Sequence, residues 1–264
     1  MKTRLDKLLV ERALAPTRER AQAIILAGRV LVNEQKQDKP GASIPGDAAI
    51  RLLGSDLRYV SRGGLKLEAA LARWNIDLHN RFCLDVGAST GGFTDCMLQH
   101  GAPRVLAIDT GYGQIAQTLR DDPCVTLMER TNARLLTPGD LPPGISFICM
   151  DVSFISATLV LSPVLTAVRH LSDAAGTNVG HASDAVGQPL LEAVILIKPQ
   201  FEAGRERIGK GGIVRDPAAH QFAIDRVRAC VGQTGATNIE VIDSPITGAE
   251  GNREFLLHAY WSLS

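Results

Sequence analysis

From residue 82 onward the chain alternates short apolar runs with stretches of helical character. The apolar runs are FCLDVGA, RVLAIDT, ISFICMDVS and EAVILIKP, and helical stretches such as FTDCMLQHG and SATLVLSPVLTAVRHL lie between them. This alternation indicates βαβ units, in which helices cover both faces of a parallel sheet. We therefore predict a doubly wound α/β fold with a mostly parallel, Rossmann-like sheet.

Four charged residues mark the ends of these expected strands. They are Asp85, Asp109, Asp151 and Lys198. In an open α/β sheet the ligand binds outside the carboxyl ends of the strands. We therefore expect the four side chains to converge on one site at that edge.

The first 58 residues follow a different pattern. RLDKLLVERAL and TRERAQAIILAG have helical spacing, with Thr17 as the expected N-cap of the second helix and Gly28 as its end. RVLVNEQ and DAAIRLL each indicate a short strand. We predict a small α+β domain over residues 1–58 and the α/β domain over residues 59–264, with a flexible insertion at about residues 172–190.

The charges are unevenly distributed between these two parts. The whole chain has 28 Lys and Arg against 28 Asp and Glu, but residues 1–58 hold 11 against 7 and the remainder holds 17 against 21. The N-terminal part is therefore the better candidate for binding phosphates.

Two further patterns limit the class of protein. No apolar run is long enough to span a bilayer, and MKTRLDKLLVERAL lacks the apolar core of a signal peptide, so we expect a cytoplasmic protein without membrane contact. The five cysteines are scattered, with no C-x-x-C pair and no histidine at metal-ligand spacing. Neither a disulfide framework nor a metal site is expected.

The stretch LDVGASTGGFTD, residues 84 to 95, predicts a strand, a glycine turn and a helix start. It has neither the G-K-[ST] of a phosphate-binding loop nor the G-x-G-x-x-G of a dinucleotide site, and Asp85 would repel a pyrophosphate. S-adenosylmethionine fits better, because it is cationic and has no phosphate. Asp109 could then accept hydrogen bonds from its ribose, or simply cap a helix, and Asn132 could meet the adenine. The expected cofactor-binding residues are Asp85, Gly87, Ala88, Ser89, Gly91, Gly92, Phe93, Thr94, Asp109, Asn132 and Asp151.

The N-terminal part resembles the S4 RNA-binding domain. The R-L-D-K-L-L opening, the T-R-x-x-A helix start and the G-x-V-x-V-N segment occur in that order. The resemblance implies RNA contacts by basic side chains, although each of these could instead lie on a solvated face. The expected RNA-binding residues are Arg4, Arg18, Arg20, Arg29, Lys36 and Arg62.

The rest of the chain resembles the TlyA family of rRNA 2′-O-methyltransferases, formerly labelled haemolysins. The motifs that carry the resemblance are YVSRGGLKLEAAL, DVGASTGGFTD, MDVSFIS, IKPQFE and GNREFLL. It implies an S4 domain followed by an FtsJ-like class I methyltransferase domain, S-adenosylmethionine as cofactor, and cytidines of ribosomal RNA within ribosomal subunits, not DNA, as substrate. It also implies a catalytic tetrad of Lys66, Asp151, Lys198 and Glu254.

Within this tetrad we expect Lys198 to remove the proton of the ribose hydroxyl. Burial at the end of the VILI run and the ammonium of Lys66 would favour a neutral amine, while Asp151 and Glu254 oppose this and hold both lysines in place. An RNA-binding assembly factor that binds the cofactor without catalysis is the alternative. A membrane-lytic protein is disfavoured, because no spanning segment or strongly amphipathic surface helix is evident.

Overall fold

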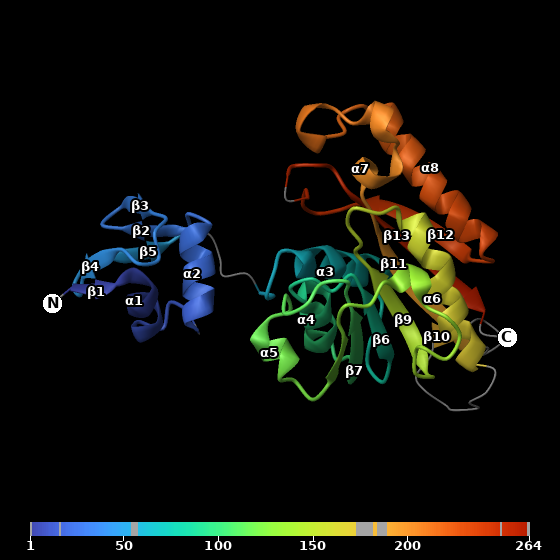
Figure 1. Cartoon of the computed structure of the whole chain (residues 1–264), viewed down its shortest axis with the longest axis horizontal. Coiled ribbons are helices and arrows are strands. Elements are labelled where there is room, and N and C mark those ends of the chain that lie inside the picture. The colour runs from blue at the N-terminus through green and yellow to red at the C-terminus, as the bar shows by residue number, and fades with distance from the viewer. Residues whose placement is uncertain are drawn as a thin grey trace. The chain divides into compact units, whose positions relative to one another are not determined.

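A computed structural model describes residues 2–15, 17–53, 58–172, 182–183, 189–248 and 250–262. The chain forms two compact units, Met1–Leu57 and Arg58–Ser264 (Figure 1). Most of the expected insertion, residues 173–181 and 184–188, lies outside the described residues.

The N-terminal unit packs two helices against short strands. β1 pairs with β4, and β2 pairs with both β3 and β5, all antiparallel. Leu5, Leu9 and Ile25 are fully buried in its core. The elements are β1 (Lys2–Arg4), α1 (Leu5–Glu11), α2 (Arg18–Leu26), β2 (Val30–Val32), β3 (Gln35–Gln37), β4 (Ser43–Pro45) and β5 (Ile50–Leu52).

In this unit one strand prediction is wrong in its extent, and the predicted cap of the second helix is confirmed. RVLVNEQ is not one strand, because the chain reverses at Asn33 and Glu34, whose φ angles are +48° and +62°. Two consecutive positive φ values are typical of the tight turn of a β-hairpin. The predicted helix cap is confirmed, since the Thr17 hydroxyl accepts a hydrogen bond of 3.2 Å from the amide of Arg20.

A buried carboxylate ties the first strand to both helices. Asp6, at the start of α1, has no exposed surface. It accepts hydrogen bonds of 3.0 and 2.8 Å from Arg4, 3.0 Å from Arg18 and 3.0 Å from Gln22. The Arg4 guanidinium is the main cause that holds the pKa of Asp6 well below its usual range.

The C-terminal unit is built on an eight-stranded sheet. The order is β12-β13-β11-β9-β6-β7-β8, and β10 pairs with β11. β6, β7, β8, β9 and β11 are parallel to their neighbours within that group, whereas β13 is antiparallel to β11 and β12. The strands are β6 (Phe82–Val86), β7 (Arg104–Ile108), β8 (Val125–Met128), β9 (Ile145–Met150), β10 (Ala182–Ser183), β11 (Pro189–Ile197), β12 (Thr237–Asp243) and β13 (Phe255–Ser262).

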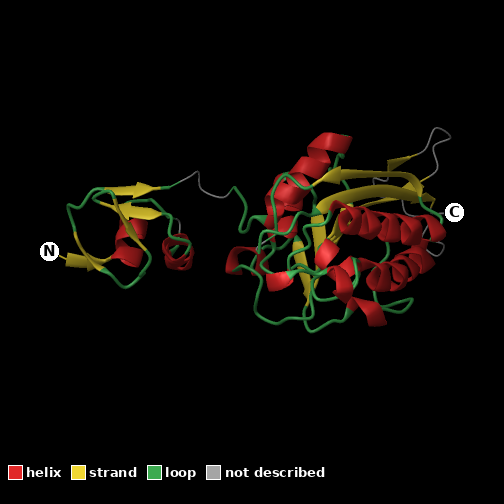
Figure 2. Ribbon diagram, turned by 90° about the horizontal axis from the view of Figure 1, so that it is seen from above, coloured by secondary structure: helices red, strands yellow, loops and turns green. Residues whose placement is uncertain are grey.

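Helices cover both faces of this sheet, as Figures 1 and 2 show. One face packs on α6 and α8 through residues such as Leu165 and Val227, and the other on α3 and α4 through residues such as Leu67 and Met97. The mostly parallel α/β fold predicted from the sequence is confirmed. The helices are α3 (Gly63–Trp74), α4 (Gly92–Gln99), α5 (Gln117–Arg120), α6 (Ala157–Ser172), α7 (Pro199–Glu202) and α8 (Pro217–Gln233), with 3-10 turns η1 (Ala133–Leu135), η2 (Arg205–Arg207) and η3 (Lys210–Gly212).

No helix in the described part of the chain has both the length and the apolar character needed to cross a membrane.

The hydrogen bonds of Asp6 predict an acid-sensitive N-terminal unit. Because folding lowers the pKa of this carboxyl, its contribution to stability is present above the ordinary value of 3.8 and is lost as the pH falls below it. We expect protection of α1 and α2 amides from hydrogen exchange, corrected for intrinsic rates, to fall in that range. Asp6→Asn should lower the protection at neutral pH and remove its acid dependence.

Asp47→Asn is the matched control, because Asp47 is an exposed carboxylate of the same unit. Equal acid sensitivity in the wild type and in Asp6→Asn would contradict this role for Asp6.

Candidate active site

The sheet register brings three of the four predicted catalytic residues to one edge. Ile197 of β11 lies opposite Phe255 of β13, so Lys198 and Glu254 are the next residues in line on neighbouring strands. β9 runs parallel to β11 with Met150 beside Ile195, and Asp151 follows directly. The carboxyl ends of parallel strands meet at the same edge, as expected from the sequence.

Lys198 forms the first of two lysine–carboxylate pairs. Its Nζ lies 2.5 Å from Asp151 Oδ1 and donates a hydrogen bond of 2.7 Å to Ser153 Oγ. The side chains of Lys198 and Asp151 are 11% and 21% exposed, so this pair remains open to a substrate.

Lys66 forms the second pair. Its Nζ donates a hydrogen bond of 2.6 Å to Glu254 Oε2, and both side chains are buried. Gly248 lies behind the carboxylate, since a Cβ there would be 2.5 Å from Glu254 Oε1. A residue of α3 is thereby joined to the beginning of β13, 188 positions away in the sequence.

The glycine turn after β6 lies directly against Asp151. Gly87 has a φ of +89°, and a Cβ on it would lie 2.5 Å from the carbonyl oxygen of Asp151. The Asp151 amide in turn donates to the carbonyl of Val86 at 2.9 Å. The turn and the strand end that carries Asp151 therefore form one rigid piece, which a side chain at residue 87 would disrupt.

Asp85 lies beneath this turn with no exposed surface. It accepts a hydrogen bond of 2.6 Å from Thr94 Oγ1, and Cys149 Sγ lies 3.6 Å from its other oxygen. Burial raises the pKa of Asp85 to about 7, although the bond from Thr94 opposes the shift. Because Asp85 is buried, other atoms of the protein would separate its carboxylate from a ligand bound on the turn. The predicted direct contact between Asp85 and the cofactor would require the turn to open.

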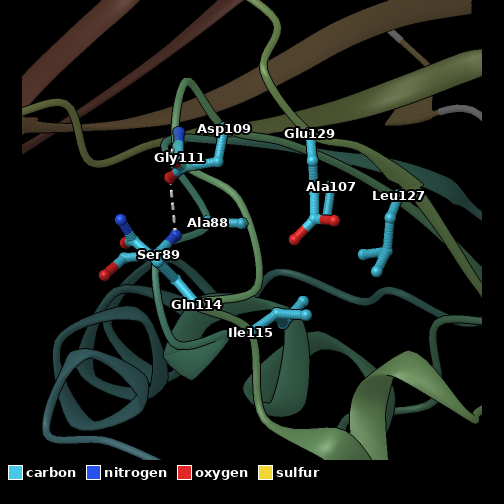
Figure 3. A pocket seen from close by; sticks show the side chains of 9 residues that line it. All are labelled: Ala88, Ser89, Ala107, Asp109, Gly111, Gln114, Ile115, Leu127 and Glu129. Atoms are coloured by element: carbon cyan, nitrogen blue, oxygen red, sulfur yellow. Dashed lines mark hydrogen bonds between the residues drawn. The ribbon is translucent and has the colours of Figure 1, made fainter.

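Asp109 holds the neighbouring loop and lines a pocket. Its Oδ2 accepts a hydrogen bond of 2.7 Å from the amide of Ser89, and its Oδ1 accepts one of 2.6 Å from the amide of Gly111. Figure 3 shows these residues around the pocket, between the turn after β6 and the ends of β7 and β8. The lining residues are Ala88, Ser89, Ala107, Asp109, Gly111, Gln114, Ile115, Leu127 and Glu129.

Six of these lining residues were not predicted from the sequence, and Glu129 is the most informative of them. Its carboxylate accepts hydrogen bonds from the Gly113 amide at 2.7 Å and from Arg120 Nη1 at 3.1 Å, and the Arg120 bond is the main cause of its lowered pKa. Glu129 directly follows β8, and an acidic residue at the end of a strand could have been predicted from the sequence to line the site. The six residues are Ala107, Gly111, Gln114, Ile115, Leu127 and Glu129.

Several predicted cofactor-binding residues also have structural contacts within the unit. Asn132 Oδ1 accepts a hydrogen bond of 3.1 Å from the Arg134 amide, which caps η1. Phe93 is buried in the core beneath α3. A Cβ on Gly91 would lie 2.3 Å from Leu119, and one on Gly92 would lie 3.0 Å from the backbone of Gly64. Their contacts with a cofactor stay predictions.

The predicted RNA-binding residues lie in two kinds of environment. Arg4 and Arg18 bind Asp6, and Arg29 donates to the Leu53 carbonyl at 2.9 Å. Lys36 is exposed and crosses the end of α2, where a Cβ on Gly28 would lie 2.2 Å from its Cε. Arg20 is half-buried on α2, and Arg62 is exposed immediately before α3.

An exposed aromatic ring stands three residues beyond Asp151. Phe154 is 93% exposed and has a φ of +63°, a conformation that a bulky residue rarely adopts. Its ring centroid lies 5.5 Å from that of Phe201. Within the described ranges, no cluster of three or more His, Cys, Asp or Glu side chains is arranged to bind a metal ion.

Comparison with known proteins identifies both units. Residues 3–48 match the S4 domain, and residues 59–261 match the FtsJ-like methyltransferase family. The chain is 40% identical over 258 residues to the 16S/23S rRNA (cytidine-2′-O)-methyltransferase TlyA of Mycobacterium tuberculosis, covering 97% of this chain and 89% of that protein. It is 47% identical over 261 residues to YqxC of Bacillus subtilis, named a "putative rRNA methyltransferase", covering 98% and 86%.

A solved structure extends this similarity to the whole fold. It is titled "Putative hemolysin from Streptococcus thermophilus", is 41% identical to this chain, and matches with a TM-score of 0.70 over 99% of this chain and 89% of that one. The resemblance predicted from the sequence motifs is confirmed. The chain therefore belongs to the TlyA family of methyltransferases, in which an S4 domain precedes an FtsJ-like methyltransferase domain.

Proposed function

We propose that this protein uses S-adenosylmethionine to methylate the ribose 2′-hydroxyl of a cytidine in ribosomal RNA, in the cytoplasm. The observation that carries the proposal is the Lys198–Asp151 pair, 2.5 Å long and partly exposed, on the strand end that touches the glycine turn. The activity for which the Mycobacterium tuberculosis relative is named supports the choice of substrate.

The pocket beside this pair has the chemistry that S-adenosylmethionine requires. Asp109 and Glu129 are its charged lining residues, and it has no lysine or arginine to bind a phosphate. Asp109 would hold the ribose hydroxyls, and Ala107, Ile115 and Leu127 would pack on the adenine. The cofactor supplies a methyl group on a sulfonium sulfur, which the acidic surroundings favour.

Lys198 would orient the ribose hydroxyl and receive its proton. Its ammonium is in ion-pair contact with Asp151 and donates one hydrogen bond to Ser153, and an ammonium has three N–H groups, so it can still donate to a substrate oxygen. The same two contacts would stabilise the ammonium that forms when the hydroxyl loses its proton. As with any general base, Lys198 must be neutral when it accepts the proton.

Lys66 would contribute by position and charge. Its ammonium is buried against Glu254, which lies beside Lys198 in the sheet register. A buried ion pair with a good hydrogen bond keeps its geometry, so the charge of Lys66 stays fixed relative to the reacting atoms. In this proposal Lys66 and Glu254 position the substrate, and Lys198 and Asp151 handle the proton.

Phe154 provides a surface for an RNA base. Recognition of single-stranded RNA commonly stacks an unpaired base on an exposed aromatic ring. With 93% of its surface exposed and Asp151 three residues away, this ring is suited to that contact.

The first prediction tests the reaction itself. Wild-type protein incubated with labelled S-adenosylmethionine and unmethylated ribosomal subunits should label a ribose 2′-oxygen, mapped by resistance of the adjacent bond to alkali. Lys198→Ala should lose about 10²-fold or more in rate while retaining cofactor affinity. Lys198→Arg should fail similarly, because a guanidinium does not lose its proton at working pH.

Near-normal turnover by Lys198→Arg would show that residue 198 supplies only charge. Cofactor binding by the wild type without any ribose methylation would instead support the assembly-factor alternative.

The second prediction concerns Asp85. Because its pKa is raised to about 7, the carboxylate gains charge as the pH rises from 6 to 8, and affinity for the cationic cofactor should rise with it. Asp85→Asn should lack this part of the pH dependence in calorimetric titrations. The ligand's own ionisation is the same with both proteins, so their difference isolates Asp85.

Thr94→Val is the matched control for Asp85. It removes the hydrogen bond that opposes the raised pKa, so the rise in affinity should move to higher pH. Identical pH profiles for all three proteins would exclude a role for the Asp85 charge.

The third prediction concerns the S4 unit. The double variant Arg20→Gln with Lys36→Gln should bind ribosomal subunits more weakly than the wild type. The slope of log K against log salt concentration should become shallower by about two, since each lost phosphate contact reduces it by about one. Cofactor affinity should not change. Lys7→Gln with Arg51→Gln removes equal charge from other exposed positions of the same unit and should have little effect.

A further inference from the structure

A basic segment, Arg205–Arg215, joins α7 to α8 in the methyltransferase unit. Its sequence RERIGKGGIVR contains four cations and one acid, Glu206. All four cationic residues are exposed. They are Arg205, Arg207, Lys210 and Arg215.

None of these four cations has a salt-bridge partner among the described residues. Elsewhere in the same unit Lys66, Arg81 and Arg120 are each paired with a carboxylate. Arg207 packs over the ring of Phe222 at 3.9 Å, a contact that leaves its charge available. The segment is therefore a concentration of uncompensated positive charge.

The segment is nevertheless held firmly. Asn252 is buried, accepts a hydrogen bond of 2.9 Å from the Val214 amide and donates one of 3.0 Å to the Gly212 carbonyl. The carbonyl of Val214 also lies 2.9 Å from His220 Nε2. Because the backbone is already ordered, a ligand that binds these cations would lose less conformational entropy.

The anchor of the segment is also part of the active-site edge. Asn252 is two residues from Glu254, and Arg205 is seven residues beyond Lys198. In Figure 1 the orange loop between α7 and α8 lies beside the red loop that leads into β13, in agreement with the Asn252 hydrogen bonds. The segment is thus tied through Asn252 to the loop that carries Glu254, which is the next residue in line with Lys198 across the two strands.

We propose that the basic segment binds backbone phosphates of the RNA that flank the target nucleotide, as a second RNA-binding surface distinct from the S4 unit. The inference rests on the proposed RNA substrate. The planar guanidinium of an arginine can donate two parallel hydrogen bonds to a phosphate. The turn at Gly211 is open to a ligand, since a Cβ there would meet nothing within 4 Å. The neighbouring acids are Glu206, Asp216 and Glu250, which four cations outnumber.

The test compares two double variants that lose equal charge. Arg205→Gln with Lys210→Gln removes two exposed, unpaired cations of the segment. The control, Arg104→Gln with Arg228→Gln, removes two exposed cations outside it, and Arg104 begins β7 at the opposite end of the sheet from Asp109. Binding to purified unmethylated ribosomal subunits is measured over a series of KCl concentrations, together with the kcat and KM of methylation.

The segment variant should flatten the salt slope by about two and raise the KM for subunits, with kcat and S-adenosylmethionine affinity retained. The control should keep the wild-type slope. The proposal would be overturned if the segment variant kept the wild-type salt slope, or if the segment variant and the control lost binding affinity to the same extent. Absence of methylation by the wild type would refute the proposed function instead, and the slope comparison would still decide the role of the segment.

Discussion

β13 runs antiparallel to β11 with Ile197 opposite Phe255, and the geometry of the active site depends on this register. It places Glu254 beside Lys198, and Glu254 in turn holds Lys66 on α3. A slip of one residue would turn every side chain of β13 to the other face of the sheet, which buries Trp261 and Leu257 on one side. The packing of the core therefore fixes the position of the charges for which we propose a catalytic role.

A second group of buried charges stabilises the same strands farther from the active site. Arg81 binds Glu192 of β11 and the Ser146 carbonyl of β9, and His258 Nε2 of β13 lies 2.7 Å from Glu192 Oε1. Buried charges are costly unless each is paired, and here each carboxylate oxygen has its own partner. Pairing of this kind specifies which strands are neighbours, so the register of β9, β11 and β13 is reinforced by polar contacts as well as by packing.

The sequence predicted the four central strands and the charged residues at their ends, because apolar runs and their order along the chain determine both. It did not predict β1 and β4, which are three residues each and pair across the whole N-terminal unit. Nor did it predict which lysine binds which carboxylate, since Lys66 and Glu254 meet only through tertiary packing. Gln114 and Ile115 were missed for a similar reason: they belong to a loop whose place beside the pocket follows from the Asp109 hydrogen bond to Gly111.

The cations of the S4 unit and those of the basic segment Arg205–Arg215 differ in how far neighbouring carboxylates compensate their charge. The two groups are therefore suited to different contacts with RNA. Arg4 and Arg18 share the buried carboxylate of Asp6, so their guanidinium groups are oriented but partly neutralised. Arg205 and Lys210 lie on a segment whose backbone is anchored by Asn252, and they have no carboxylate partner among the described residues. At physiological salt the Debye screening length is about 8 Å, so an uncompensated cation contributes most to RNA affinity where a phosphate comes into direct contact with it. If the proposed RNA contacts are made, the oriented arginines would favour recognition of shape by the S4 unit, and the uncompensated cations of the basic segment would help to retain the strand that carries the reacting ribose.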